Sequence, residues 1–231
     1  MAPTKSSTRA ERVYLALRKD ILAGRRTPGS RLPFAELCST YDASMGVVRE
    51  ALSRLTAEGL VQAEPQLGFR TTPVSIKDLE HLTEARVAIE SLVLREALEH
   101  GGVQWESDVL AAHHRLQQTP QMDADDPERL SDAWVEVHAA YHLALLSGCP
   151  NPRLLAIARS LRDSAELYRR WSVPLGHEHR DIVSEHKSIL DAILAKEADA
   201  AVAILVEHIR HTTQVLLRTV DAPATGSSST A

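Results

Sequence analysis

Two patterns of apolar and polar positions succeed one another along the chain, and the change comes near residue 75. Before that point the pattern indicates short elements. A short helix is predicted after Pro33, whose missing N–H costs nothing in a first helical turn, and the pattern fades at residues 41–43, where we expect a turn. A second helix then carries apolar residues at spacings of three and four, which predict one buried stripe: Val48, Ala51, Leu52 and Leu55.

The ends of this second helix and the residues after it indicate the kind of domain. Ser44 is expected to cap the helix through its side chain, and Gly59 can take the left-handed conformation that ends it. Two short runs, Leu60–Glu64 and Phe69–Thr72, flank a turn that contains Pro and Gly, and they predict a hairpin. The whole predicts a winged helix-turn-helix, which places a helix in the major groove of DNA and the hairpin along the backbone. A small helical subdomain that binds a protein is the alternative.

The residues that this arrangement turns outward are candidates for contact with DNA. The predicted DNA-binding set is Arg31, Ser44, Met45, Gly46, Arg49, Gly68 and Arg70. Arg54 is expected to face outward as well. Met45 and Gly46 offer no side-chain hydrogen bonds to base edges. Sequence specificity is therefore expected to depend on Ser44, Arg49, the hairpin and the shape of the DNA.

From residue 76 onward the apolar positions follow helical spacing, and alternating strand patterns are absent. The predicted helices are Ile76–His100, Glu106–Gln118, Pro127–Ser147, Pro152–Trp171, Arg180–Lys196 and Ala198–Val220. The expected fold is mainly α, with the winged helix-turn-helix over residues 11–75 and an antiparallel all-α helical bundle over residues 76–221. Residues 1–10 and 222–231 are rich in Ser, Thr, Ala and Pro, and we expect them to be disordered tails.

Composition and charge narrow the class of protein. The 231 residues, 44% of them hydrophobic, suffice for two small domains with a core each. Two cysteines indicate a reducing compartment, and the lack of any apolar run of signal-peptide or membrane-span length predicts a cytoplasmic protein. Residues 1–75 carry 11 Lys and Arg against 7 Asp and Glu, whereas residues 76–231 carry 15 against 24. The basic N-terminal part is therefore the expected contact with nucleic acid.

Four histidines fall on apolar faces of the predicted helices. His138 and His142 are four residues apart on a face shared with Trp134 and Leu145, so both imidazoles can point inward at one ion. Two later helices contribute one histidine each. These are His186, on the stripe of Ile182, Ile189 and Ile193, and His208, on the stripe of Ala201, Ile204, Leu205, Thr212 and Val215.

A single inward histidine is more often a hydrogen-bonded core residue than a metal ligand. Four inward histidines on three helices would leave many buried polar atoms to satisfy without an ion, so a metal site is the preferred interpretation. Ligation by nitrogen favours Zn²⁺, with Ni²⁺ or Cu²⁺ also suited on affinity grounds, whereas Mg²⁺ and Ca²⁺ prefer oxygen. By contrast, His211 shares its face with polar and charged residues and is expected to face solvent.

Two arginines on apolar helix faces are candidates for binding an anionic effector. Arg86 stands within an apolar stripe, an expensive place for a permanent cation unless an anion pairs with it. The partner is either Glu90, four residues on, or an effector carboxylate. Arg162 borders a second stripe and is a weaker candidate of the same kind. A metal together with a guanidinium would suit a short carboxylic or dicarboxylic acid.

Several short motifs of the N-terminal part keep a common order and spacing. They are Arg31-Leu32-Pro33, Glu36-Leu37, Val48-Arg49-Glu50-Ala51-Leu52, Arg54-Leu55, Glu58-Gly59-Leu60-Val61 and Gly68. In these motifs the chain resembles the DNA-binding domain of GntR-family bacterial transcription regulators. The resemblance implies a homodimer that places two winged helices on a pseudo-palindromic operator.

A second pattern spans three of the predicted helices. It reads His138-Ala139-Ala140-Tyr141-His142, then Glu185-His186, then Glu207-His208-Ile209. It resembles the ligand-binding domain of the FadR branch of the family, the FCD type, whose metal-binding members use Asp-x3-His on one helix and one histidine on each of two later helices. His138 stands at the usual aspartate position. One negative charge is thereby removed from the site, so a bound dication keeps more charge for an anionic ligand.

Further segments of the helical part bear on the effector. They are Trp105-Glu106-x-Asp108-Val109-Leu110, Ser147-Gly148-Cys149 and Tyr168-Arg169-x-Trp171. With the paired histidines of the first helix they resemble the glutarate-responsive, carbon-starvation-associated repressors of this branch. That resemblance implies a repressor released by glutarate or a relative such as 2-hydroxyglutarate.

Two other functions fit the same histidines. One is a DNA-binding protein with a purely structural zinc and no effector. The other, less favoured, is a metallohydrolase. The sequence lacks the glutamate of HExxH zinc proteases, a Gly-rich phosphate loop and a nucleophile elbow, so we do not expect an enzyme.

Overall fold

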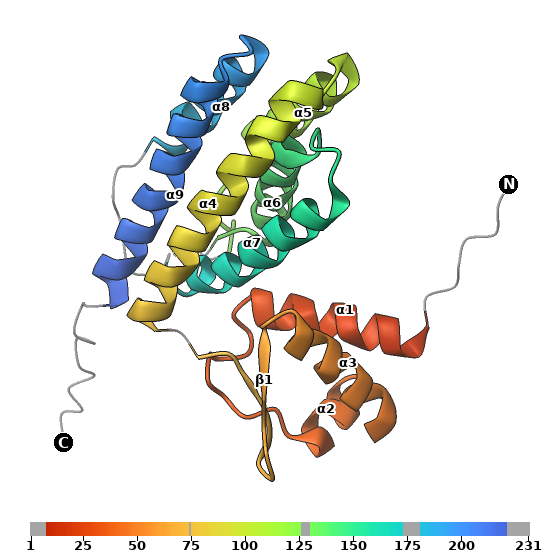
Figure 1. Cartoon of the computed structure of the whole chain (residues 1–231). Coiled ribbons are helices and arrows are strands. Elements are labelled where there is room, and N and C mark those ends of the chain that lie inside the picture. The colour runs from red at the N-terminus through yellow and green to blue at the C-terminus, as the bar shows by residue number, and fades with distance from the viewer. Residues whose placement is uncertain (1–7, 74, 126–129, 173–180, 221–231) are drawn as a thin grey trace, which may run out of the picture. The chain divides into compact units, whose positions relative to one another are not determined.

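The computed structural model describes residues 8–73, 75–125, 130–172 and 181–220. The contacts within the chain divide it into two units, residues 1–75 with 160–170, and residues 76–159 with 171–231. The described residues form two hydrophobic cores, one within residues 13–61 and one within residues 93–209. The elements shown in Figure 1 are mainly helices, with a single two-stranded sheet among the described residues.

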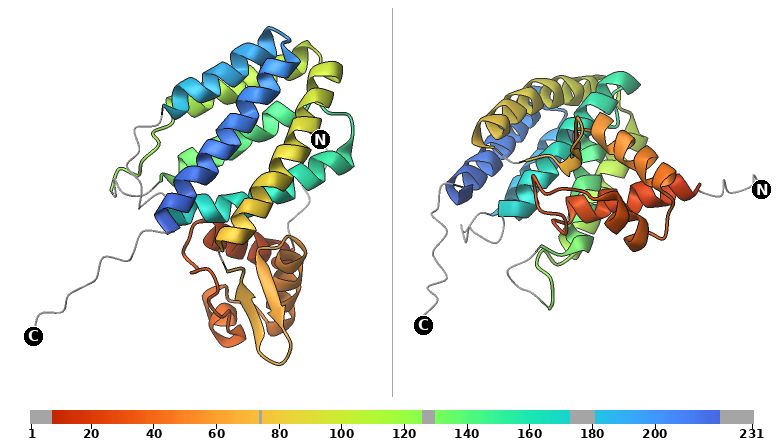
Figure 2. Two further views of the ribbon diagram at one scale, coloured as in Figure 1. Left: turned by 60° about the vertical axis from the view of Figure 1, so that its left-hand side comes forward. Right: turned by 90° about the horizontal axis from the view of Figure 1, so that it is seen from below.

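The N-terminal residues of the first unit form three helices followed by a hairpin, and residues 160–170 of a later helix complete the unit. The N-terminal elements are α1 (Arg9–Leu22), α2 (Phe34–Thr40) and α3 (Met45–Ala57), then β1 (Val61–Glu64) and β2 (Gly68–Thr71). α1 packs against α3, and the stripe predicted for α3 is fully buried: Val48, Ala51, Leu52 and Leu55. The strands pair antiparallel from Val61 with Thr71 to Glu64 with Gly68, and the left panel of Figure 2 shows them side by side. The predicted winged helix-turn-helix is confirmed.

Two details of the first unit differ from the expectation. Ser44 occupies the N-cap position of α3 in an extended conformation, but its side chain makes no capping hydrogen bond, so the predicted side-chain cap is wrong. Helix α1 begins at Arg9, so Arg9 and Ala10 are helical and do not belong to a tail. The cause is Thr8, whose hydroxyl accepts a hydrogen bond from the Glu11 N–H at 3.1 Å and caps α1. Most of both predicted tails lies outside the described residues.

The second unit is built from helices. They are α4 (Ile76–His100), α5 (Val103–Gln118), α6 (Asp132–Leu146), α8 (Ile182–Leu194) and α9 (Ala198–Val220), with the first residues of α7 (Pro152–Ser172). α4 packs along α9, α5 along α6, and α8 along α9, and Figure 1 shows α4 and α9 as neighbours. The predicted all-α bundle is confirmed. No helix in the described ranges is long and apolar enough to cross a membrane.

Local caps fix where the helices that carry the histidines begin. α6 starts after Ser131, whose hydroxyl accepts a hydrogen bond from the Trp134 N–H at 3.4 Å. α8 starts after Asp181, whose carboxylate accepts one from the Ser184 N–H at 2.9 Å. Each cap satisfies a backbone donor that the first helical turn leaves without a partner. The caps thereby fix the helical phase of the residues one and two turns further on.

Candidate functional site

The four histidines that the sequence singled out come together inside the second unit. His138 and His142 project from one face of α6, His186 from α8 and His208 from α9. All four side chains are buried, with exposures of 4, 1, 2 and 7%, and their nearest ligand atoms all lie within 4.8 Å of one another. We call these residues the four-histidine cluster.

The spacing within the cluster suits a small transition-metal ion. His142 Nε2 lies 3.2 Å from His138 Nε2 and 3.2 Å from His186 Nε2. With zinc-to-nitrogen bonds of about 2.0–2.1 Å, two ligand nitrogens on a tetrahedral ion stand about 3.3 Å apart. Burying several imidazoles costs free energy unless their nitrogens find partners, and a cation would bind their lone pairs. The cluster therefore has the donors for one nitrogen-ligated dication, and the spacing of two of its pairs already fits one.

The four-histidine cluster has a neighbouring carboxylate whose role the sequence did not predict. Glu185 Oε2 lies 2.8 Å from His208 Nδ1, and its Oε1 lies 3.2 Å from His211 Nδ1. A carboxylate on Nδ1 fixes the orientation of a ligating imidazole and leaves Nε2 as the nitrogen for a metal. His211 was expected to face solvent. Its side chain is 36% exposed, but it also contacts Glu185, so the expectation was incomplete. Only the adjacency of Glu185 to His186 in the sequence could have pointed to this role.

Aromatic side chains position the other members of the cluster. The Trp134 ring stacks on His138, with centroids 4.5 Å apart and planes inclined by 24°. The Tyr141 hydroxyl donates a hydrogen bond to the backbone carbonyl of His186 at 2.8 Å, which links α6 to α8. Burial raises the pKa of Tyr141 above its usual value, so the hydroxyl stays a donor at neutral pH. These contacts fix imidazoles from two helices relative to each other.

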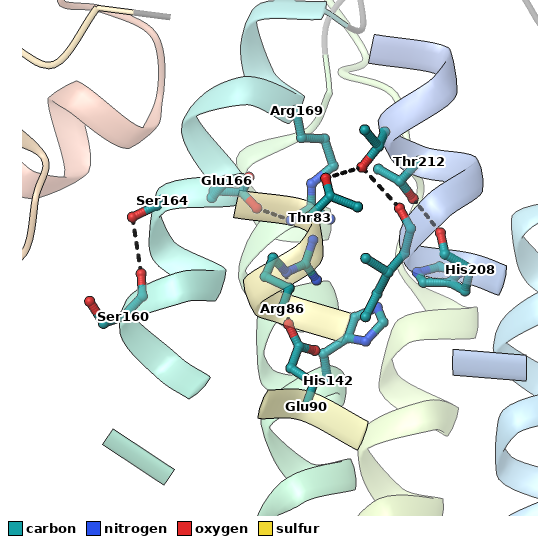
Figure 3. Close-up of polar contacts among 12 residues, drawn as sticks. Thr83, Arg86, Glu90, His142, Ser160, Ser164, Glu166, Arg169, His208 and Thr212 are labelled. Carbon is teal, nitrogen blue, oxygen red and sulfur yellow. Dashed lines mark hydrogen bonds and ion pairs between the residues drawn. The ribbon is translucent and has the colours of Figure 1, made fainter. Parts of the chain in front are cut away.

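The two candidate effector arginines have different surroundings. Arg86 on α4 is 8% exposed, and its Nε donates to Glu90 Oε1 at 2.7 Å, so the internal partner that the sequence offered is present (Figure 3). Figure 3 also shows Thr212 donating a hydrogen bond to the backbone carbonyl of His208, at 2.8 Å. Arg162 is 8% exposed and lies in the segment of α7 that belongs to the first unit.

Most of the residues predicted to contact DNA lie at the start of α3 or on the hairpin of the first unit, whereas Arg31 precedes α2. Ser44, Met45, Gly46 and Arg49 are exposed, and Met45 is 56% exposed despite its apolar side chain. The Arg49 guanidinium lies 5.0 Å from the centroid of the Phe34 ring on α2. A cation over an aromatic face is partly held in place without losing its charge. Arg49 is therefore presented at the surface with a preferred orientation.

Arg70 of the hairpin and Arg54 of α3 each bind a carboxylate of the first unit. Arg70 donates to Glu64 Oε2 at 2.7 Å across the strand pair, and Arg31 forms an isolated β-bridge with Arg70. Gly68 has a φ of 95°, a conformation that favours glycine at the start of β2. Arg54, which was expected to face outward, is partly exposed and also packs on α1. Its Nη1 donates to Glu11 Oε2 at 2.5 Å, and its guanidinium lies 3.8 Å from the Tyr14 ring centroid.

Both parts of the chain match known protein families. Residues 9–70 match the bacterial regulatory proteins of the gntR family, and residues 81–211 match the FCD domain. The chain is 35% identical to the HTH-type transcriptional regulator BphR of Paraburkholderia xenovorans (strain LB400), over 89% of this chain and 84% of that protein. It is 34% identical to the HTH-type transcriptional repressor GlaR of Escherichia coli (strain K12), over 85% of this chain and 90% of that protein.

Solved structures show the same fold at lower identity. E. coli McbR/YncC matches with a TM-score of 0.76 and 20% identity, over 94% of this chain and 100% of that chain. A GntR transcriptional regulator from Rhodococcus sp. RHA1 matches with a TM-score of 0.73 and 24% identity, over 91% of this chain and 98% of that one. The similarity thus extends over both the winged helix-turn-helix and the helical bundle.

Proposed function

The chain belongs to the GntR family of bacterial transcription regulators with an FCD domain, and from that premise we propose that it is a metal-containing repressor released by a small carboxylic or dicarboxylic acid. Its relatives are transcription regulators and not enzymes. The observation that supports the proposal is the buried four-histidine cluster, which offers four nitrogen donors for a dication inside the part of the chain that matches the FCD domain.

Zinc is the metal that the cluster fits best. Its donors are imidazole nitrogens only, which suit Zn²⁺, and next Ni²⁺ or Cu²⁺, better than the oxygen-seeking Mg²⁺ and Ca²⁺. When bound, the metal would supply a concentrated positive charge that attracts an effector carboxylate. Because neutral imidazoles do not cancel that charge, anion affinity should exceed that of a site with an aspartate at the position of His138. Glu185 orients His208 from outside the donor set.

The effector proposed for this site is a short dicarboxylate such as glutarate or 2-hydroxyglutarate. Support comes from the sequence resemblance to glutarate-responsive repressors and from the relative GlaR, whose name describes it as a repressor. Arg86, in the same unit as the cluster, is the proposed partner for a carboxylate, and Arg162 in the first unit stays a prediction from the sequence. Since Glu90 already binds Arg86, the acid would add to, or compete with, an existing ion pair. In either case the response to the effector would depend on Glu90.

In this proposal, DNA is bound by two copies of the first unit, one from each protomer of a homodimer. A homodimer places two copies of α3 on a pseudo-palindromic operator, with Ser44, Arg49 and the hairpin as contacts. Met45 and Gly46 would approach the bases without side-chain hydrogen bonds, so sequence-dependent DNA shape would supply part of the specificity. Effector binding in the bundle would then change the spacing or mobility of the two α3 helices.

The experiment that tests this proposal combines metal analysis with thermal unfolding. Protein purified without chelators should hold about one equivalent of zinc per chain, and His186→Ala should lose most of it while the exposed His100→Ala keeps it. Glutarate should raise the melting temperature of the zinc-loaded wild type in a saturable way, because only the folded state binds it.

The outcomes separate the proposal from its alternative. Zinc at full occupancy with no shift from any short organic acid would indicate a closed, purely structural site. Full metal occupancy in His186→Ala would remove His186 from the ligand set. Weaker binding of operator DNA by the zinc-loaded protein on addition of glutarate would support release of the repressor.

A further inference from the structure

A basic cleft lies on the first unit, between α1 and the turn that joins α2 to α3. Its volume is about 400 Å³. Its described lining comes from α1 and from the turn: Arg9, Arg12, Val13, Ala16, Tyr41 and Asp42. None of these residues belongs to the set that the sequence predicted to contact DNA. We call this feature the α1 cleft.

Helical spacing places both arginines of the α1 cleft on one face of α1. Arg12 follows Arg9 by three residues, and Val13 follows it by four, so the three side chains are neighbours on the helix surface. Val13 is 4% exposed and packs into the core, whereas both arginines are exposed. Two guanidinium groups on a buried apolar base therefore line a surface that solvent reaches.

A carboxylate of the first unit already binds in the α1 cleft. Arg9 Nη2 donates to Asp42 Oδ2 at 2.7 Å and also to the Asp42 backbone carbonyl. The Asp42 side chain is 100% exposed, so this ion pair gains little in water. Two arginines against one aspartate leave the described lining with one net positive charge. The cleft thus binds an anionic group through arginine, and phosphate oxygens suit the same donors.

The α1 cleft adjoins the start of the helix proposed to read DNA. Asp42 stands two residues before Ser44, the N-cap of α3, and two residues of chain span at most about 7 Å. The major groove is about 12 Å wide, so its phosphates lie about 6 Å to either side of a helix start at its centre. When the start of α3 enters the groove, the Arg9 guanidinium at Asp42 is therefore within reach of a phosphate.

We propose that the α1 cleft binds a phosphate of the DNA backbone beside the base pairs that the start of α3 contacts. Arg12 binds the phosphate directly, and Arg9 exchanges the Asp42 carboxylate for it. This inference rests on the proposed placement of α3 in the major groove. A phosphate contact of this kind carries no sequence information itself, but it fixes the register of α3 on the duplex.

The test is the salt dependence of binding of the full-length protein to a short duplex of mixed sequence, measured by fluorescence anisotropy. Arg12→Gln should weaken binding and reduce the slope of log affinity against log salt by about one for each bound protomer, because one phosphate keeps its counterion. Arg12→Lys keeps the charge and should retain the wild-type slope. The matched control is Arg95→Gln, which breaks a similarly exposed pair with Asp199 in the second unit and should leave the slope unaltered.

Asp42→Asn distinguishes phosphate binding from a purely structural ion pair. If Arg9 exchanges its partner, loss of the carboxylate leaves Arg9 available to DNA, so affinity should rise and the slope should steepen by up to about one for each bound protomer. The double variant Arg9→Gln/Asp42→Asn should lose that steepening. If the pair only holds the turn before α3, Asp42→Asn should instead bind DNA more weakly than the wild type.

Two results would overturn the proposal. The first is a wild-type slope for Arg12→Gln where Arg49→Ala lowers the slope, which would keep α3 in the groove but remove the α1 cleft from the DNA contact. The second is weaker binding by Asp42→Asn, which would assign Arg9 to the turn alone. A wild-type slope for both Arg49→Ala and Arg12→Gln would contradict the placement of α3 itself, and the inference would fail with it.

Discussion

Glu185 binds His208 through a carboxylate-to-imidazole contact of 2.8 Å, so the residue beside one cluster histidine in the sequence orients another in space. The same carboxylate reaches His211 with its second oxygen, at 3.2 Å. A carboxylate in this position fixes which nitrogen of His208 faces the cluster and raises its basicity. The contact joins α8 to α9 at the proposed metal centre.

Removal of this carboxylate should weaken metal binding. Glu185→Ala is expected to lower zinc affinity by about 10–100-fold, because His208 loses the partner that holds its orientation. Competition with a chromophoric chelator measures the change. Glu207→Ala is the matched control, since Glu207 is exposed and adjacent to His208 on α9, and it should leave the affinity unaltered. Equal affinities for wild type and Glu185→Ala would exclude the orienting role.

The buried pair of Arg86 and Glu90 should matter more for stability than surface pairs do. The Arg86 side chain is 10% exposed and that of Glu90 is 0% exposed, so Glu90→Ala leaves a buried cation without its carboxylate. We expect a loss of about 3–5 kcal/mol in the free energy of unfolding. The control is Asp191→Ala, which breaks the exposed pair with Lys187 and should cost less than about 1 kcal/mol.

Urea unfolding followed by far-UV circular dichroism measures both variants. The double variant Arg86→Met/Glu90→Leu should recover most of the loss, because it removes the unpaired charge as well as its partner. Equal losses in the free energy of unfolding for Glu90→Ala and Asp191→Ala would mean that solvent screens the pair of Arg86 and Glu90. Burial would then not explain the importance of that pair.

Periodicity predicted most of the fold because each element has a face that must be buried. The stripe of Val48, Ala51, Leu52 and Leu55 on α3 and the inward histidines of α6, α8 and α9 follow from spacing alone. Helix α1 was missed, although Thr8 and Glu11 form a recognisable N-cap ahead of it. Arg54 is 39% exposed at its side chain, but spacing alone did not predict its contacts with α1, because a face that points away from one core can still pack on another helix.

Contacts between residues that lie far apart in the chain could not be predicted from the sequence. Glu185 meets His208 only because α8 and α9 pack together, and Tyr141 reaches the carbonyl of His186 only because α6 and α8 do. The sequence predicted which side chains point inward, but tertiary packing decides which of them meet.

Alkaline pH should destabilise the first unit through Tyr14. Burial, and then the hydrogen bond that Tyr14 donates to Glu58, raise the pKa of Tyr14 to about 12. An unfolded tyrosine ionises near pH 10, so the folded state holds this proton more tightly. The resulting stabilisation is complete below about pH 10 and is lost as the pH rises to about 12.

The measurement compares the free energy of unfolding of wild type and Tyr14→Phe across that pH range. The wild type should lose more stability between pH 10 and 12, since the phenylalanine of the variant has no proton to release. Other buried tyrosines titrate in both proteins, so only the difference between the two curves reports Tyr14. Parallel curves would show that Tyr14 keeps an ordinary pKa.

Arg49 should contribute a phosphate contact that Arg54, on the same helix, does not. Arg49 is exposed and held over the Phe34 ring, whereas the Arg54 guanidinium is occupied by Glu11 and Tyr14. Arg49→Ala is expected to weaken binding to a short duplex of mixed sequence and to reduce the slope of log affinity against log salt by about one, as one released counterion requires. Arg54→Ala should lower stability but leave the slope unaltered. Fluorescence anisotropy over a range of salt concentrations measures both, and a slope that falls for Arg54→Ala but not for Arg49→Ala would reverse the assignment of the DNA-facing side of α3.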